Sequence, residues 1–277
     1  MSEEELEEVE VREEIVPGVA RALSPMVRRI LATNPSPRTG LGTNTYLVGI
    51  DEIAVIDPGP LDKDHLDSIC GCGGDLIRWI LVTNSDPHHA EAVQELKART
   101  GAQVMAMADI ERDDKLADGD QIVGTEFRLT VRHLPGPSDL NVGLMLEEER
   151  TLFSGDLILE GSTAAILPPQ GDMAKYLESL ESLKKYRLKR IAPAHGYLIE
   201  NPKEVVDEYI THRLAREKQI LDAVGGGSGR VEDVASTIYG DLEDEEVIEL
   251  AQGTVHAHLL KLKSDGAVKG TKNWALA

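Results

Sequence analysis

Cysteine and aromatic residues are scarce in this sequence of 277 residues. The two cysteines, Cys70 and Cys72, have a single residue between them, which is poor spacing for a structural disulfide. We interpret them as reduced thiols, because no second cysteine pair is available to complete a thiolate metal site. Aromatic residues make up only 4% of the chain, so the core is expected to be mainly aliphatic.

Long apolar runs and excess positive charge are also missing. No apolar run approaches the roughly 18 residues of a membrane span, and the N-terminus is acidic where a secretory signal would be basic and then apolar. A cytoplasmic location is therefore predicted. The 29 basic residues are outnumbered by 49 acidic ones, and a net charge of −20 disfavours general binding to polyanions. Eight glutamates and one arginine within residues 1–14 predict a disordered acidic tail.

The chain is long enough for one large α/β domain with a small appendage. Its hydrophobic share of 41% and charged share of 28% are those of an ordinary globular protein. Strands predominate and helices intervene singly, which favours sheets covered by helices over a regular doubly wound sheet. The predicted strands are 45–48, 53–56, 79–83, 103–107, 127–134, 141–146 and 151–153, with a strand and loop over 191–196 and helices over about 86–101 and 173–186.

The sequence changes in character after Pro202. A helical pattern over 205–224 ends in the glycine-rich run 225–229, which is typical of a flexible joint or of a helix end. The last 48 residues show three helical faces followed by a turn and a short hairpin, and this order predicts a winged helix. We therefore expect three parts, namely the acidic tail (1–14), a main domain (15–203), and a linking helix with a winged-helix-like unit (204–277).

Side chains of the types that bind metals follow three of the predicted strands. Asp86, His88 and His89 lie in the loop after one buried strand, whereas Asp156 and His195 each follow a later apolar run. Such loops let side chains converge on a ligand while the strands fix the backbone. Imidazole and carboxylate groups together suit zinc, iron or manganese.

Each of these residues also has a simpler structural interpretation. Asp86 stands before a proline, and this pair is typical of a helix start with a capping carboxylate. His88 and His89 are compatible with solvent-facing positions in the first turn of that helix. Asp156 after a glycine is compatible with a turn, and a single histidine such as His195 is often a hydrogen-bonded structural residue.

Several short motifs along the chain carry a family resemblance. They are Gly42-Thr43-Asn44-Thr45-Tyr46-Leu47-Val48, Ile56-Asp57-Pro58-Gly59, Leu81-Val82-Thr83, His133-Leu134-Pro135-Gly136, Leu152-Phe153-Ser154-Gly155-Asp156, Pro193-Ala194-His195-Gly196 and, in the linking helix, His212-Arg213. In order and spacing they resemble the metallo-β-lactamase superfamily, in particular the subgroup typified by beta-lactamase-like protein two with its terminal winged-helix-like unit. The resemblance spans most of the chain and implies an αββα sandwich of two mixed sheets, with the site on loops at one sheet edge.

The metal loop departs from the pattern of this family. The family loop reads His-x-His-x-Asp-His, so Asn84 and Asp86 stand at its first two histidine positions and His88 stands at its aspartate position. Pro137 stands at the place of the third-motif histidine and offers no side-chain ligand. The first of the family's two metal sites keeps at best Asp86. His133 is a loose candidate for a replacement ligand, although an ordinary strand-end position is the simpler interpretation.

The resemblance implies a hydrolase of ester, amide, thioester or phosphodiester bonds that works with a reduced metal site. We expect at most one well-held ion, zinc or else iron or manganese, at the family's second site, with Asp86 as the general base. Binding of two ions and binding of none are the alternatives, and a catalytically inactive binding or scaffold protein is the rival function. The expected ligands are His88, His89, Asp156 and His195.

The winged-helix-like unit raises the question of nucleic acid. Residues 228–277 contain five basic and nine acidic residues, a net charge of −4 that is opposite in sign to what duplex binding needs. Within this unit, residues 251–277 carry a local charge of +3, which is compatible with an anionic substrate tail, with single-stranded RNA or with a simple solvated face. We expect a small-molecule or short anionic substrate and no membrane, and leave open whether the chain forms a homo-oligomer.

Overall fold

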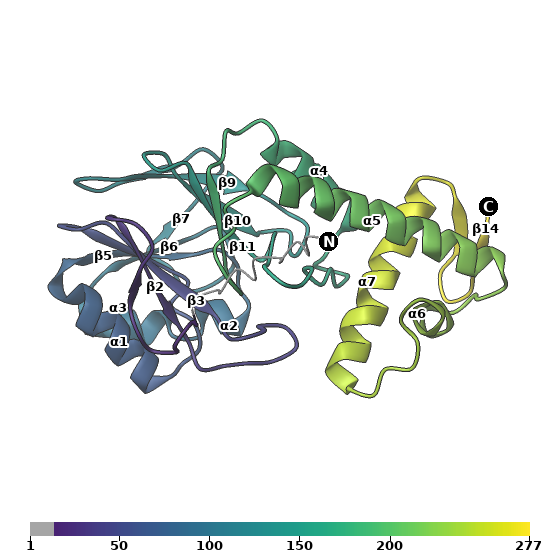
Figure 1. Ribbon diagram of the computed structural model, residues 1–277, viewed down its shortest axis with the longest axis horizontal. Helices are drawn as coiled ribbons and strands as arrows, with labels where there is room; N and C mark the ends of the chain where they lie inside the picture. The colour runs from purple at the N-terminus through teal and green to yellow at the C-terminus, as the bar shows by residue number, and fades with distance from the viewer. Residues whose placement is uncertain (1–13) are drawn as a thin grey trace, which may run out of the picture.

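The structure, a computed structural model, describes residues 14–277 and is built around two mixed β-sheets (Figure 1). The acidic tail predicted for residues 1–14 lies outside the described residues, apart from Glu14. The first sheet has the strand order β1 (Arg21–Ala22), β2 (Val27–Leu31), β3 (Asn44–Val48), β4 (Ile53–Ile56), β5 (Ile77–Val82), β6 (Gln103–Ala106), β7 (Asp114–Lys115). The second has the order β12 (Arg190–Pro193), β11 (Thr151–Gly155), β10 (Val142–Leu146), β9 (Arg128–His133), β8 (Gln121–Val123).

Helices cover the outer faces of both sheets, while the inner faces pack on each other. Alternation along β11 shows these two environments, since Leu152 lies in the apolar cluster under the helices and Phe153 lies in the cluster between the sheets. The predicted αββα sandwich is therefore confirmed. The covering helices are α1 (Lys63–Gly73) and α3 (Val93–Thr100) on the first sheet, and α4 (Met173–Leu183) and α5 (Pro202–Gly225) on the second.

Parallel strand pairs bring the candidate site loops to one edge of the sandwich. Strand β4 is parallel to β5, and β11 is parallel to β12, so the loops after each pair begin side by side. The two sheets are tied together at this edge, because the Val142 N–H donates to Thr83 O (2.9 Å) and the Asn44 N–H donates to Ala194 O (2.7 Å). Residues after β5, β11 and β12 therefore meet in space although they are far apart in the sequence.

A separate unit with its own apolar core follows the sandwich (Figure 1). Ile220 of α5, Leu259 and Trp274 are buried together in this core. The arrangement confirms the predicted winged-helix-like unit. Its elements are α6 (Val231–Tyr239), α7 (Glu245–Ser264), β13 (Val268–Gly270) and β14 (Trp274–Leu276), packed on the end of α5.

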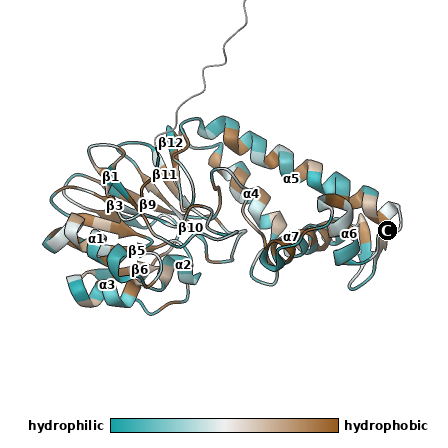
Figure 2. Ribbon diagram, turned by 60° about the horizontal axis from the view of Figure 1, so that its bottom comes forward, coloured by the Kyte–Doolittle hydropathy of each residue, from teal (hydrophilic) through white to brown (hydrophobic). Residues whose placement is uncertain are grey.

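The glycine-rich run 225–229 forms a packed corner where α5 ends. The Gly226 N–H donates to Asp222 O (2.9 Å), and the Trp274 N–H donates to Gly229 O (2.6 Å). These bonds join the helix end to the hairpin. Polar and apolar residues alternate along α5 (Figure 2), and within residues 14–277 no helix is both long and apolar enough to cross a bilayer.

The helix predicted from Asp86 to Gly101 is in fact two short helices, α2 (Pro87–Ala90) and α3. The prediction of one continuous helix was wrong because the backbone between them pairs with the loop after β4. The Gly59 N–H donates to His89 O (3.2 Å), and the Ala92 N–H donates to Gly59 O (3.1 Å). This contact also sets the position of His89. Strand β2, which the sequence pattern does not single out, has two adjacent arginines that hide its apolar character.

Candidate metal centre

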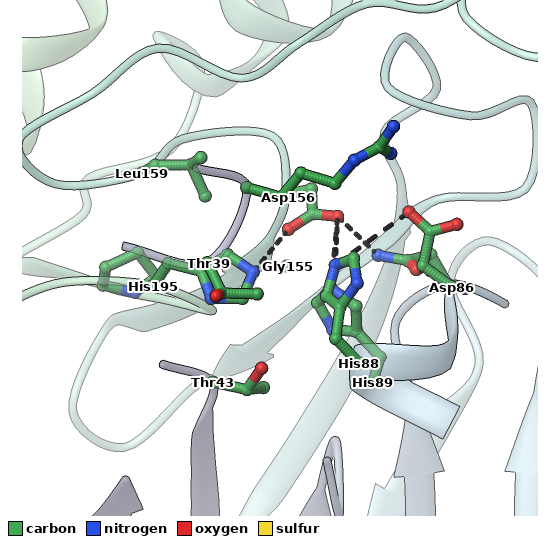
Figure 3. A network of polar contacts seen from close by, with 12 residues as sticks. Thr39, Thr43, Asp86, His88, His89, Gly155, Asp156, Leu159 and His195 are labelled. Atoms are coloured by element: carbon green, nitrogen blue, oxygen red, sulfur yellow. Dashed lines mark hydrogen bonds and ion pairs between the residues drawn. The ribbon is translucent and has the colours of Figure 1, made fainter. Parts of the chain in front are cut away.

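Three histidines and an aspartate come together at the shared edge of the sheets (Figure 3). His88, His89, Asp156 and His195 each offer one ligand atom, and these atoms lie within 4.8 Å of one another. Asp156 Oδ2 is 3.1 Å from His89 Nε2 and 3.8 Å from His88 Nε2, while Asp156 Oδ1 is 3.4 Å from His195 Nε2. The four residues expected to hold one ion are thus neighbours in the fold.

In two of the imidazole rings, the nitrogen that faces away from the cluster has a polar partner of its own. His89 Nδ1 lies 2.9 Å from Asp57 Oδ2, and His195 Nδ1 lies 2.9 Å from the backbone oxygen of Gly42. Since a carbonyl can only accept, His195 Nδ1 is the donor, and in the neutral ring its Nε2 carries the free lone pair. Partners of this kind orient metal-binding histidines and set their tautomer. Both rings are buried and present Nε2 to the site.

Asp57 is itself held by the end of β5. The Thr83 N–H donates to Asp57 Oδ1 (2.8 Å), and the Thr83 hydroxyl donates to Asp57 Oδ2 (2.7 Å). Asp57 has a left-handed backbone with φ 51°, a strained conformation for this residue type. Gly155 approaches from the other sheet with φ 53°, where a Cβ would lie 2.8 Å from Thr83 Oγ1. Thr83 and Gly42 are positioning residues that sequence reasoning did not identify as such, because their roles depend on contacts between distant loops.

The donor set fits one transition-metal ion. His195 Nε2 and Asp156 Oδ1 are buried and have no hydrogen-bond partner among the described residues, although buried polar atoms are nearly always paired. Three imidazole nitrogens and one carboxylate oxygen form a suitable tetrahedral set for zinc, and iron and manganese accept the same ligand types. An ion between these atoms would satisfy both of the unpaired ones.

Asn84 contacts the cluster from the position where the family pattern has its first histidine. Its amide Nδ2 donates to Asp156 Oδ2 (3.1 Å), and its Oδ1 accepts the Asp86 N–H (2.9 Å). The amide thus satisfies one carboxylate oxygen with a neutral donor. The sequence reveals the replacement of the histidine, but only the structure shows this bond.

Opposite charges inside the cluster shift two pKa values in opposite directions. Burial opposes protonation of His89, but the carboxylates of Asp156 and Asp57 outweigh it and raise the pKa of His89 well above its ordinary value. Burial also opposes ionisation of Asp156, but the charge of His89 and the close imidazole nitrogens of His195, His88 and His89 lower the pKa of Asp156 well below its ordinary value. Without an ion the cluster therefore holds a protonated His89 against an ionised Asp156, and a metal ion would replace that proton.

Asp86 lies beside the four-residue group and outside it. Its Oδ2 is 4.0 Å from His88 Nε2, and its side chain is 54% exposed. It stands at the cap position of α2 as the sequence predicted, yet its carboxylate makes no capping hydrogen bond. His133 lies elsewhere, with Nε2 2.7 Å from Asp139 O, and does not replace a ligand.

A cavity of about 540 Å³ opens beside the cluster and reaches the C-terminal unit. Its volume is typical of small-molecule sites. Arg38 lies in its wall and bridges the two parts of the chain through ion pairs with Glu246 (3.2 Å) and Glu249 (3.8 Å) of α7. The wall therefore combines the metal-type ligands of the sandwich with residues of the winged-helix-like unit, among them His88, Asp156, Tyr239, Leu242, Val247 and Leu250.

The fold and the histidine cluster define the class of the protein. Residues 38–195 match the metallo-beta-lactamase superfamily, and residues 231–274 match the beta-lactamase associated winged helix domain. The chain belongs to the metallo-beta-lactamase superfamily.

Two sequence relatives and a solved structure match this chain over most of their own length. The Beta-lactamase-like protein 2 homolog of Caenorhabditis elegans is 32% identical over 263 residues, which cover 89% of this chain and 87% of that protein. An atrochrysone carboxyl ACP thioesterase of Aspergillus novofumigatus is 31% identical over 287 residues, which cover 96% of this chain and 87% of that protein. A beta-lactamase domain protein from Burkholderia ambifaria has the same fold, with a TM-score of 0.84 at 18% identity over 95% of each chain. The family relatives thus include thioesterases.

Proposed function

We propose that the protein is a metal-dependent hydrolase that uses one ion, with a thioester as its first candidate substrate and esters and phosphodiesters as further ones. One observation carries the proposal. Four ligand atoms lie within 4.8 Å of one another beside a ligand-sized cavity that His88 and Asp156 line, and His195 Nε2 and Asp156 Oδ1 are buried with no hydrogen-bond partner within residues 14–277. The thioester is tested first because a relative that matches 96% of this chain is named as a thioesterase.

The residues of the site have three different roles in this reaction, namely metal binding, ligand positioning and proton transfer. When bound, the ion lowers the pKa of a water molecule and polarises the substrate carbonyl. His88, His89, His195 and Asp156 hold the ion, and Asp57 keeps His89 in place. The carboxylate of Asp86 is half exposed on the cavity wall, so it takes a proton from the water whose oxygen bonds to the carbonyl carbon. When the carbon–sulfur bond breaks, Asp86 returns this proton to the leaving thiolate.

Metal analysis and turnover test the proposal together. The wild-type protein, grown and dialysed with zinc, iron or manganese, is expected to retain about one ion per chain and to hydrolyse acyl thioesters. His89→Ala and Asp156→Ala should lose both properties. His133→Ala is the matched control, because this exposed histidine bonds a backbone oxygen away from the cluster.

Two results would overturn the proposal. One is wild-type protein with less than roughly 0.1 ion per chain under these conditions, since three imidazoles and a carboxylate that form a true site should retain a transition-metal ion through dialysis. The other is activity that survives both His89→Ala and Asp156→Ala. An ion held without turnover of thioesters, esters or phosphodiesters would favour the binding or scaffold alternative.

A further inference from the structure

Arg213 of α5 is a buried arginine that has no acidic partner among the described residues. Its side chain is 2% exposed, its Nη2 donates to the backbone oxygen of Ala164, and its Nε is buried without a hydrogen-bond partner. The guanidinium carbon lies 5.1 Å from the ring centre of Tyr176. Within residues 14–277 it forms no ion pair, since Glu217 one turn later pairs with Lys261 instead. A guanidinium has five N–H donors, so this one keeps capacity for a ligand.

The same arginine forms part of the wall of the cavity that reaches the metal centre. Arg38 is the other arginine in this wall, and Glu246 and Glu249 already neutralise it. Arg213 has no such neutralising partner in the part of the chain that the structure describes. A buried charge without a partner is costly, and an anion supplied by a ligand would remove that cost.

Arg213 is buried, and the cavity wall that it helps to form also contains apolar side chains. Attraction between opposite charges is stronger in such surroundings than in open water. A ligand that fills the cavity would therefore place its reactive carbonyl at the metal centre, an apolar middle along the wall and an anion at Arg213. The apolar wall residues include Leu159, Ala164, Leu167, Leu242, Val247 and Leu250.

We propose that Arg213 binds a carboxylate at the far end of the acyl group of the substrate. This inference rests on the proposed function, because the carboxylate belongs to the molecule whose carbonyl is hydrolysed. The planar fork of a guanidinium matches a carboxylate in two parallel hydrogen bonds. One guanidinium also balances one carboxylate, whereas a phosphate with about −1.5 to −2 charges would leave negative charge buried. The substrate class is thus an acyl thioester or ester that ends in a carboxylate.

Equilibrium binding of two probes tests the carboxylate site without any hydrolysis. Hexanoate and hexanamide have the same length and differ in charge, and NMR titration measures their affinities for the zinc-loaded protein. Wild type should bind hexanoate on the order of 10- to 100-fold more tightly than hexanamide, as expected for charge-assisted hydrogen bonds in a buried site. Arg213→Gln should lose this preference, and Arg213→Lys should keep part of it. Lys218→Gln removes the same charge from an exposed position on α5 and should behave as wild type.

Equal affinities of wild type for the two probes would overturn the inference. A preference that persists in a folded Arg213→Gln variant would overturn it as well, because the carboxylate would then sit on the metal. If Arg213→Gln does not fold, the wild-type protein alone decides through hydrolysis of N-acetylcysteamine thioesters. Succinyl, glutaryl and adipoyl thioesters end in a carboxylate, and butanoyl, pentanoyl and hexanoyl thioesters are their uncharged counterparts of equal length. For at least one of these three pairs, the KM of the carboxylate-bearing thioester should be at least about tenfold lower. No such difference at any length would refute the site.

The two proposals fail in different ways. Hydrolysis of uncharged thioesters with no preference for carboxylates refutes the Arg213 site and leaves the hydrolase intact. A hexanoate preference that depends on Arg213, together with no turnover of any ester or thioester, refutes the hydrolase and leaves a carboxylate-binding site.

Discussion

The amide of Asn84 donates a hydrogen bond to Asp156 Oδ2 over 3.1 Å, from the position where the family pattern has its first histidine. Asp86 and Pro137 stand at the other two histidine positions of the first metal, and both line the same cavity as Asn84. The three residues that replace the family's histidines come from two separate loops and thus face one cavity. This explains why we expect one ion and not two.

Restoring all three histidines should restore the second ion. The triple variant Asn84→His, Asp86→His, Pro137→His is expected to bind about two zinc ions per chain, because three imidazoles beside Asp156 complete a tetrahedral set. Asn84→His alone should stay near one, since one added imidazole is too few. Elemental analysis after dialysis measures the ratio. A folded triple variant that still binds a single ion would show that the backbone of the loop, and not its side chains, excludes the first metal.

Asp86→Asn should separate catalysis from metal binding. The amide has the shape of the carboxylate but cannot take a proton, so kcat is expected to fall about 10²- to 10⁴-fold with zinc content unchanged. Asp109→Asn, at a 97% exposed position, serves as the control. Loss of zinc from Asp86→Asn would make Asp86 a ligand, and an unchanged kcat would assign the proton transfer to another group.

The sequence predicts the sandwich and the meeting of three strand ends for a simple reason. Apolar runs mark strands β5, β11 and β12, and the metal-type residues follow directly after them. Parallel pairing then places these residues at one edge. Residues adjacent to strand ends are therefore visible from the sequence alone.

Contacts between distant loops are not visible in this way. The bond from Asn84 to Asp156 joins loops of different sheets, and the break between α2 and α3 arises because Gly59 pairs with the backbone there. Neither local propensity nor hydrophobic period reports such pairing. The same holds for Arg213, which lies on a regular helix. Only the complete fold shows that its Nε is buried without a hydrogen-bond partner among the described residues.

Asp57→Asn should weaken zinc binding without touching a ligand. The carboxylate of Asp57 receives hydrogen bonds from Thr83 and faces His89 Nδ1 at 2.9 Å, and an amide cannot accept all of these bonds. Zinc affinity is expected to fall about 10- to 100-fold, as for other outer partners of metal-bound histidines. Competition with a chelator measures it. Asp113→Asn, which removes a surface ion pair with Lys97, should leave the affinity unchanged, and an equal loss in both variants would point to general destabilisation.

The pKa of His89 in the metal-free protein predicts two opposite pH dependences. Because this pKa is raised above its ordinary value of 6.5, the pairing of His89 with Asp156 stabilises the fold fully below pH 6.5 and less as the pH rises through the folded pKa. The pKa of Asp156 is lowered below its ordinary value of 3.8. Its ionised carboxylate therefore stabilises the fold fully above pH 3.8, and this stabilisation is lost as the pH falls through the folded pKa. Both contributions are thus complete between about pH 3.8 and 6.5.

Zinc binding should follow the opposite course, because the ion competes with the proton on His89. Below the folded pKa of His89, one released proton makes the apparent zinc affinity rise about tenfold per pH unit. Denaturation of the metal-free protein from pH 6 to 9 should meanwhile show the stability advantage of wild type over His89→Gln shrinking. His133→Gln, at an exposed position outside the cluster, should show neither trend relative to wild type. A zinc affinity that does not change between pH 6 and 8 would mean that His89 is not a ligand, since a protonated imidazole has no lone pair for the metal.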